Sequence, residues 1–150
     1  MAIWGRITGG ANLILALNNF SKEMEAELTS AVQDTAERVR TGVVRSIQKG
    51  PKTGRVYQRG AISHRASAPG QAPATDQGDL ASSYHRVDGR LVSAVGSGLD
   101  KAPMLEFGTS KMQARPHLFP ALEAQRPYYV ERLKKATTNA ASKVTGKVLK

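Results

Sequence analysis

Two stretches of the chain place hydrophobic or small residues at helical spacing, and they predict its framework. The first helix is expected to begin at Ser21, which can cap a helix, and to end at the stop signal Lys49-Gly50-Pro51. The second begins near Leu118, and Pro127 interrupts it, so this helix either kinks there or begins its stable part near Tyr128. The predicted buried faces carry Met24, Leu28, Ala31, Thr35, Val39, Gly42 or Val43, and Ile47 in the first helix, and Leu118, Leu122, Gln125, Tyr129, Leu133, Ala136, Ala140 and Val144 in the second.

Between these helices the hydrophobic pattern shortens to strand length. Residues 84–87 and 91–95 flank Asp88-Gly89-Arg90, and an Asp-Gly pair favours a two-residue turn, so an antiparallel hairpin is expected. Residues 103–107 predict a helical turn that Gly108 closes. Thr75 or Asp76 is expected to cap a short helix that runs through Leu80, and a short strand is expected at Ile3, Trp4 and Ile7.

The order of these elements predicts an α+β fold in a single domain, residues 1–150. A long N-terminal helix and a C-terminal helix would pack on a small antiparallel β-sheet. Residues 136–150 are expected to form a flexible basic tail, since Lys143, Lys147 and Lys150 lie near the end of the chain.

Residues 51–75 have a different composition. This segment contains three prolines, three glycines, five basic or histidine side chains and no acid. Because Ala68 and Ala72 precede proline they favour extended conformations, and residues 55–62 can form one leg of a loose β-hairpin. We expect an extended basic arm that, folded back on itself, reaches about 40 Å at roughly 3.3 Å per residue. The alternative is a solvated loop without a partner.

Net charge and composition limit the classes of partner and of binding site that this chain can have. The 150-residue chain carries a net charge of +10, which favours polyanions or acidic protein surfaces. It has no cysteine, so disulfides and cysteine zinc sites are excluded. The apolar run at residues 13–17 is too short for a secretory signal or a membrane span, so we expect a product of the reducing cytoplasm with no membrane contact.

No pattern typical of an enzyme is visible. His64, His85 and His117 are isolated from one another, which argues against a metal site, and residues 50–55 fall one residue short of a phosphate-binding loop. We therefore expect no catalytic residues, cofactor or metal. A basic module that contacts DNA without reading its sequence remains an alternative, because arm cations such as Lys52 can neutralise phosphates.

Two separated motifs resemble a known family. They are the arm, residues 64–76 (HRASAPGQAPATD) with Gly78 and Leu80, and a downstream segment, residues 102–118, which contains APMLEFGTSKM and ARPHL. Between them lies Val95-Gly96-Ser97. In this order they resemble the tailed-bacteriophage minor tail component family, whose members belong to the neck and tail-completion region of long-tailed phages.

The resemblance implies a non-enzymatic virion protein, assembled in the host cytoplasm, that forms a ring, usually hexameric, at the head-tail junction. Its partners would be further copies, head-closure or connector proteins, and the tail tube or tail terminator. A tail terminator that caps the tube is the alternative role. The arm residues expected at interfaces are Arg55, Tyr57, Arg59, His64, Arg65, Pro69 and Pro73. The residues expected to form a structural corner beside the sheet, or an interface there, are Leu105, Glu106, Phe107, Lys111, Arg115 and Pro116.

Overall fold

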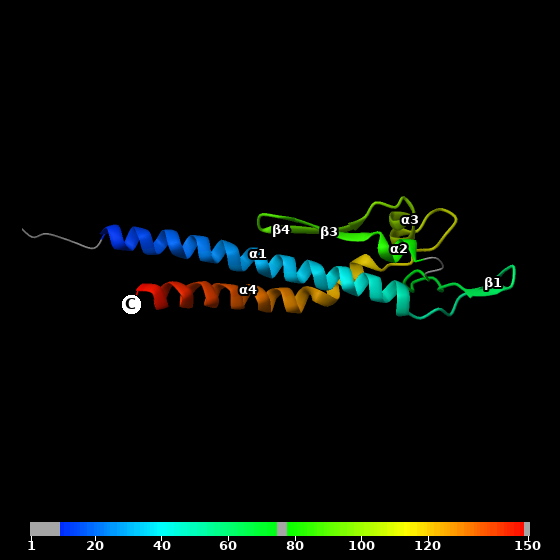
Figure 1. Cartoon of the computed structure of the whole chain (residues 1–150). Coiled ribbons are helices and arrows are strands. Elements are labelled where there is room, and N and C mark those ends of the chain that lie inside the picture. The colour runs from blue at the N-terminus through cyan, green and yellow to red at the C-terminus, as the bar shows by residue number, and fades with distance from the viewer. Residues whose placement is uncertain (1–9, 75–77, 149–150) are drawn as a thin grey trace, which may run out of the picture.

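The computed structural model describes residues 10–74 and 78–148 of the chain. The strand expected near Trp4 and the helix cap expected at Thr75 or Asp76 lie outside the described residues. Two long helices run side by side in opposite directions, and two small β-hairpins are attached to them (Figure 1). The mixture of helices with small antiparallel sheets confirms the α+β class.

Helix α1 (Gly10–Lys49) is longer than predicted. It runs through Ser21 without a break, so the expected N-cap there is wrong. The stop signal is confirmed, because the helix ends at Lys49 and the N–H of Gly50 donates to the carbonyl of Ser46 at 2.9 Å. At 1.5 Å per residue, α1 is a rod about 60 Å long.

Helix α4 (Leu118–Val148) begins at Leu118 and continues through Pro127. The expected alternative, a helix whose stable part begins near Tyr128, is therefore wrong. Pro127 is exposed, and a carbonyl that loses its helical partner on the exposed side can bond to water. The segment expected to be a flexible tail is part of this helix as far as Val148, because it packs along α1.

Small residues form the seam between the two helices. Ala31 of α1 and Ala136 and Ala140 of α4 are fully buried, and side chains of this size let helices approach closely. Ion pairs flank the seam: Lys143 contacts Glu27 at 2.6 Å, next to the buried Ala140. Two further contacts, Arg132 with Asp34 at 2.7 Å and the Arg38 guanidinium 3.8 Å from the centre of the Tyr128 ring, join the same two helices.

Strands β3 (Tyr84–Gly89) and β4 (Val92–Ser97) form the predicted antiparallel hairpin along α1 (Figure 1). Pairing runs from Tyr84 with Ser97 to Gly89 with Val92, so the two turn residues are Arg90 and Leu91. The two-residue turn expected at Asp88-Gly89 is therefore displaced by two residues. Leu91 has the positive φ of 56° that the turn requires, so the pairing register, and not the Asp-Gly preference, sets the turn position.

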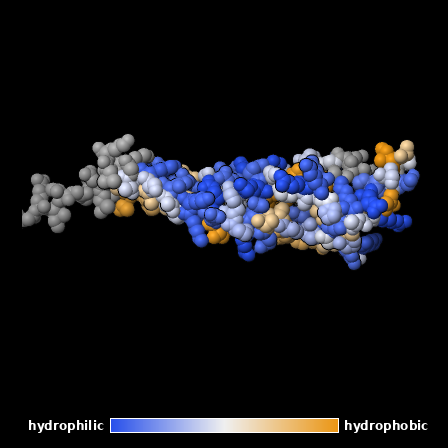
Figure 2. Space-filling view, turned by 90° about the horizontal axis from the view of Figure 1, so that it is seen from below, coloured by the Kyte–Doolittle hydropathy of each residue, from blue (hydrophilic) through white to orange (hydrophobic). Residues whose placement is uncertain are grey.

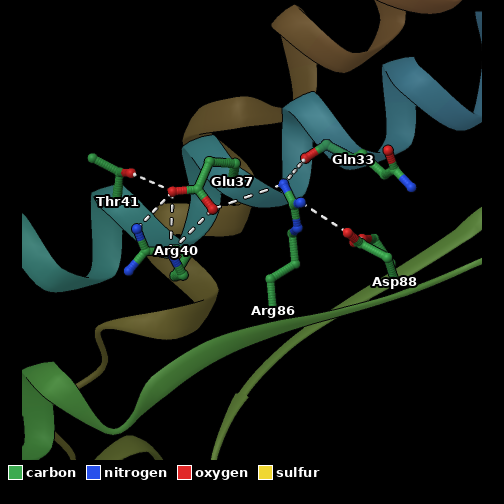
Figure 3. A network of polar contacts seen from close by, with 7 residues as sticks. Gln33, Glu37, Arg40, Thr41, Arg86 and Asp88 are labelled. Carbon is green, nitrogen blue, oxygen red and sulfur yellow. Dashed lines mark hydrogen bonds and ion pairs between the residues drawn. The ribbon is translucent and has the colours of Figure 1, made fainter.

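A polar network ties this hairpin to α1 (Figure 3). The Arg86 guanidinium of β3 donates to the carbonyl of Gln33 at 3.0 Å and pairs with Asp88 at 2.8 Å and Glu37 at 3.8 Å. Glu37 also binds Arg40 of the next turn at 2.6 Å. Arg86 thus joins the strand to the helix through two acceptors on α1, while Asp88 of its own strand holds the guanidinium in place.

Two short helices complete the core. Helix α2 (Asp79–Ser82) follows Gly78, and α3 (Lys101–Phe107) is the predicted turn, begun two residues earlier and closed by Gly108. The buried cluster comprises Val39, Val43, Ile47, Leu80, Ala81, Tyr84 and Ala102. It is small for a chain of this length, and most of α1 and α4 lies outside it.

The second hairpin is separate from this core. Strands β1 (Val56–Arg59) and β2 (Ile62–Arg65) pair with each other and extend beyond the C-terminal end of α1 (Figure 1). The two long helices and the projecting hairpin make the described part of the chain elongated (Figure 1).

Candidate assembly interface

The two sequence motifs lie next to each other in space. The Gly70 N–H donates to the carbonyl of Ala114 at 2.9 Å, and the Arg115 side chain donates to the carbonyl of Ser67 at 3.2 Å. The backbone N–H of Arg115 in turn donates to Leu105 at 2.7 Å. The arm motif and the downstream motif therefore form a single structural unit, which we call the corner (residues 66–71 and 105–118).

Gln71 holds the base of the arm closed. Its Oε1 accepts the N–H of Ala68 at 2.9 Å and that of Thr53 at 3.2 Å, while its Nε2 donates to the Thr53 hydroxyl at 2.8 Å. Gly54 donates to Ala66 at 2.9 Å, and a Cβ at Gly54 would lie only 2.5 Å from the Ser67 carbonyl oxygen. Glycine is thus required where the two sides of the base meet.

These bonds shorten the arm. Residues 66–74 fold back along their own chain, with Ser67 and Pro73 buried, so only the β1–β2 hairpin projects. At about 3.3 Å per residue the hairpin extends roughly 15 Å, and the expected reach of 40 Å is wrong. The hydrogen bonds of Thr53, Gly54, Ala66 and Gln71 fix the position at which the hairpin leaves the domain.

A buried polar cluster anchors the other side of the corner. Glu106 accepts the backbone N–H groups of His117, Leu118 and Phe119, each at 2.9 Å, so a carboxylate from α3 caps the N-terminus of α4. The His117 Nδ1 lies 2.9 Å from the carbonyl of Arg115 and 3.0 Å from Glu106. Because both neighbours are acceptors, Nδ1 carries the hydrogen.

The opposite imidazole nitrogen faces Tyr84. With Nδ1 protonated, Nε2 accepts the Tyr84 hydroxyl hydrogen at 2.7 Å, and the two rings meet edge to face. Burial, together with the nearby Glu106 charge, raises the pKa of Tyr84 to about 12. Burial also acts to raise the pKa of Glu106, but the three N–H groups and His117 outweigh it and leave that pKa below its usual value. The cluster is fully hydrogen-bonded, which is the arrangement of a structural anchor.

The projecting hairpin carries exposed apolar side chains. Val56 is 45% exposed, Tyr57 51% and Ile62 70%. The Arg55 guanidinium lies 5.7 Å from the centre of the Tyr57 ring. Figure 2 shows hydrophobic atoms at this end of the molecule, next to hydrophilic surface. An exposed apolar group among cations is typical of a protein interface.

The same end of the molecule is basic. No Asp or Glu occurs in the sequence from 41 to 75. Within the described residues, no ion pair holds the cations of this region, Arg45, Lys49, Lys52, Arg55 and Arg65. By contrast, the acids of α1, such as Glu27 and Glu37, are paired with cations of α4 and of α1 itself. The uncompensated charge is thus concentrated at the hairpin end.

The structure separates the residues expected at interfaces into exposed and buried groups. Exposed are Arg55, Tyr57, Arg65, Pro69, Phe107 and Lys111, whereas His64, Leu105, Arg115 and Pro116 are partly buried and Pro73 and Glu106 are buried. The backbone of Arg59 lies in β1, and its side chain is outside the described part. Pro73 and Glu106 therefore contact their own chain and are not accessible to a partner.

Two corner residues, and one residue of β3 that contacts the corner, were not expected from the sequence. Tyr84, Gln71 and Ser67 supply bonds that join segments 18 to 48 residues apart. Nothing in the local pattern marks them, although Gln71 and Ser67 fall inside the arm motif.

Comparisons with protein-family models, with curated proteins and with solved structures found no match. In the described part of the chain, no helix is both long and apolar enough to cross a membrane. Among the same residues, no group of three or more histidine or carboxylate side chains is placed to hold a metal ion.

Proposed function

We propose that this chain is a structural virion protein of a tailed phage, which forms a ring in the neck and joins the tail tube to head-closure proteins. The observation that carries the proposal is the corner. The two motifs that resemble the minor tail component family are hydrogen-bonded to each other, and together they fix the base of a basic hairpin. An assembly protein needs such a rigid base, because its projecting hairpin must meet the neighbouring subunit in one orientation.

The distribution of apolar surface supports assembly over catalysis. The buried core is small, while Val56, Tyr57, Ile62, Phe107 and Phe119 are each 45% exposed or more. Val56, Tyr57 and Ile62 belong to one hairpin, and Phe107 contacts Phe119, and grouped exposed apolar side chains mark surfaces that bind a partner. Ring formation would cover them.

The basic charge at the hairpin end indicates that the neighbouring protein has an acidic surface. Cations without partners in their own chain steer association with a negative surface, and carboxylates there would offset the cost of desolvating them. Head-closure or tail-tube proteins with acidic rims would fit this end. The proposed location is the neck of the virion.

A deletion in the phage that encodes the chain tests this role. Without the protein, lysates should contain filled heads and tails of normal length that do not join, and adding purified protein should restore infectious particles. Tails of uncontrolled length would instead identify the tail terminator role. Joined, infectious particles in the absence of the protein would refute both.

One observation favours a second candidate, contact with phage DNA. The unpaired cations Arg45, Lys49, Lys52, Arg55 and Arg65 gather at one end, and they could neutralise phosphates. A titration with duplex DNA at two salt concentrations separates the candidates. Tight binding whose affinity falls steeply with salt supports DNA contact, and weak binding with a shallow slope supports an acidic protein partner.

A further inference from the structure

An apolar groove of about 500 Å³ runs between β4, α1 and the first part of α4. Its lining is formed by Val32, Thr35, Ala36 and Val39 of α1, Leu91 to Val95 of the β3–β4 hairpin, and Leu118, Phe119, Leu122 and Tyr129 of α4. Leu91, Val92, Phe119 and Leu122 are each 45% to 58% exposed. Phe107 extends the apolar surface, because its ring lies 5.8 Å from that of Phe119.

The groove follows the edge of a strand. Five consecutive residues, 91–95, line it, whereas the face of a sheet would contribute only every second residue. Within the described residues β4 pairs with β3 alone, so the other edge of β4 offers unpaired N–H and C=O groups. An apolar trough beside a free strand edge fits an incoming β-strand, which would bond to β4 and place its side chains in the trough.

The β1–β2 hairpin has few contacts that stabilise it within its own chain. Its main contacts are between its own two strands, and an isolated two-stranded hairpin is marginally stable in water. Its apolar side chains, Val56, Tyr57 and Ile62, are exposed. It also cannot fill its own groove, because it extends beyond the end of α1, while the groove lies at Val32 to Val39, ten residues or more before that end (Figure 1).

We propose that the β1–β2 hairpin of one copy of this chain binds in the groove of the next copy and adds its strands to β4. This inference rests on the proposed ring and names the contact that builds it. The two surfaces differ and lie at different places on the rod, so the contact is head to tail and continues from copy to copy until the ring closes.

Charge on the groove rim suits this occupant. Glu123 follows Leu122 on α4. Its side chain is 62% exposed, and within the described residues it pairs only with Arg126, 74% exposed, at 3.4 Å. Such a pair exchanges partners at little cost. Arg55 or Arg65, which flank the apolar residues of the hairpin and have no ion pair within the described chain, can take its place.

Disulfide cross-linking tests the contact directly, because the chain has no cysteine of its own. Protein carrying Ile62→Cys is mixed with protein carrying Leu122→Cys under mild oxidation. The control replaces Leu122→Cys by Val130→Cys, which lies on the same helix, outside the groove, and is equally exposed at 46%. We expect the groove pair to cross-link at least about tenfold more than the control pair, as a tenfold difference needs only about 1.4 kcal/mol of preference.

Equal cross-linking of both pairs, or none, overturns the proposal. A third pair, Leu17→Cys with Leu122→Cys, tests another exposed apolar segment, since Leu17 is 57% exposed near the start of α1. If this pair cross-links in preference to the hairpin pair, the occupant is α1 and not β1–β2, and the proposal is wrong.

A mixing experiment tests the head-to-tail geometry without cysteines. Ile62→Asp disables the hairpin and Leu122→Asp disables the groove, and both sites are exposed enough for the fold to tolerate the change. Each variant alone should be monomeric in sedimentation velocity, and a mixture should form dimers and nothing larger. Monomers in the mixture would overturn the contact.

The cross-linking experiment and the tail-joining experiment can fail independently of each other. If the hairpin pair cross-links but the protein does not restore tail joining, the inference stands and the neck role fails. If the protein restores tail joining while the groove pair does not cross-link, the neck role stands and the inference fails.

Discussion

The buried carboxylate of Glu106 provides the sharpest test of how the corner is held. Glu106 accepts three backbone N–H groups at the start of α4 and is 6% exposed. In Glu106→Gln one oxygen becomes an NH2 group that faces these donors, so at least one of the three bonds is lost together with the negative charge at the helix N-terminus. With about 1.5 to 3 kcal/mol for a hydrogen bond to a charged group, and up to about 1 kcal/mol for the helix dipole, we expect a loss of about 3 kcal/mol.

Urea denaturation followed by circular dichroism measures this loss. In a thermal melt it corresponds to a fall in Tm of roughly 6 to 12 °C for a chain of this size. Glu131→Gln is the matched control, because Glu131 lies on α4, is exposed and contacts Lys135 at only 3.8 Å. The control should change the free energy of unfolding by less than about 0.5 kcal/mol. A Glu106→Gln variant as stable as the control would refute the capping argument.

The same carboxylate predicts a dependence on pH. The pKa of Glu106 is lowered in the folded chain, since the N–H groups outweigh the effect of burial, so the folded state holds its proton less tightly than the unfolded state. Its contribution is complete above the unfolded pKa of about 4.5 and is lost as the pH falls through the lower folded value. The stability gap between the unaltered chain and Glu106→Gln should therefore be largest near pH 7 and shrink below about pH 4. A gap that stays constant down to about pH 2 would contradict this assignment.

Three further substitutions test other parts of the fold by the same denaturation assay. Tyr84→Phe removes the donor to the buried His117 Nε2 and should cost about 1 to 2 kcal/mol, and no loss would mean that the imidazole finds another partner. Gly108→Ala should cost more than about 1 kcal/mol, because Gly108 has a φ of 79° and a Cβ would lie 2.8 Å from Ala114 N, whereas Gly98→Ala meets open space; equal effects would refute the argument. Ala140→Leu should destabilise by about 1 to 3 kcal/mol by forcing α1 and α4 apart, and the exposed Ala141→Leu should not; a neutral Ala140→Leu would show that the seam is loosely packed.

Local signals in the sequence predict several elements well. The stop at Lys49-Gly50-Pro51, the turn closed by Gly108 and the antiparallel hairpin before residue 98 depend on a few neighbouring residues, and all are present in the structure. The α+β class follows from their order.

The errors come from contacts between distant segments. Residues 136–148 are helical because Ala136 and Ala140 pack on α1, about a hundred residues away in the chain, and no local pattern reveals this. The arm is shorter than expected because Arg115 and Ala114 bind its second half from more than forty residues downstream. The groove beside β4 was also not predicted, since three elements must come together before it exists.

Electron cryomicroscopy of the virus particles in which this chain is proposed to assemble tests the central proposal most directly. We expect a closed ring of this protein between the head connector and the tail tube, with each β1–β2 hairpin bound to the β4 edge of a neighbouring copy. Particles in which the neck lacks this chain, or contains it as separate copies that do not touch one another, would contradict the account.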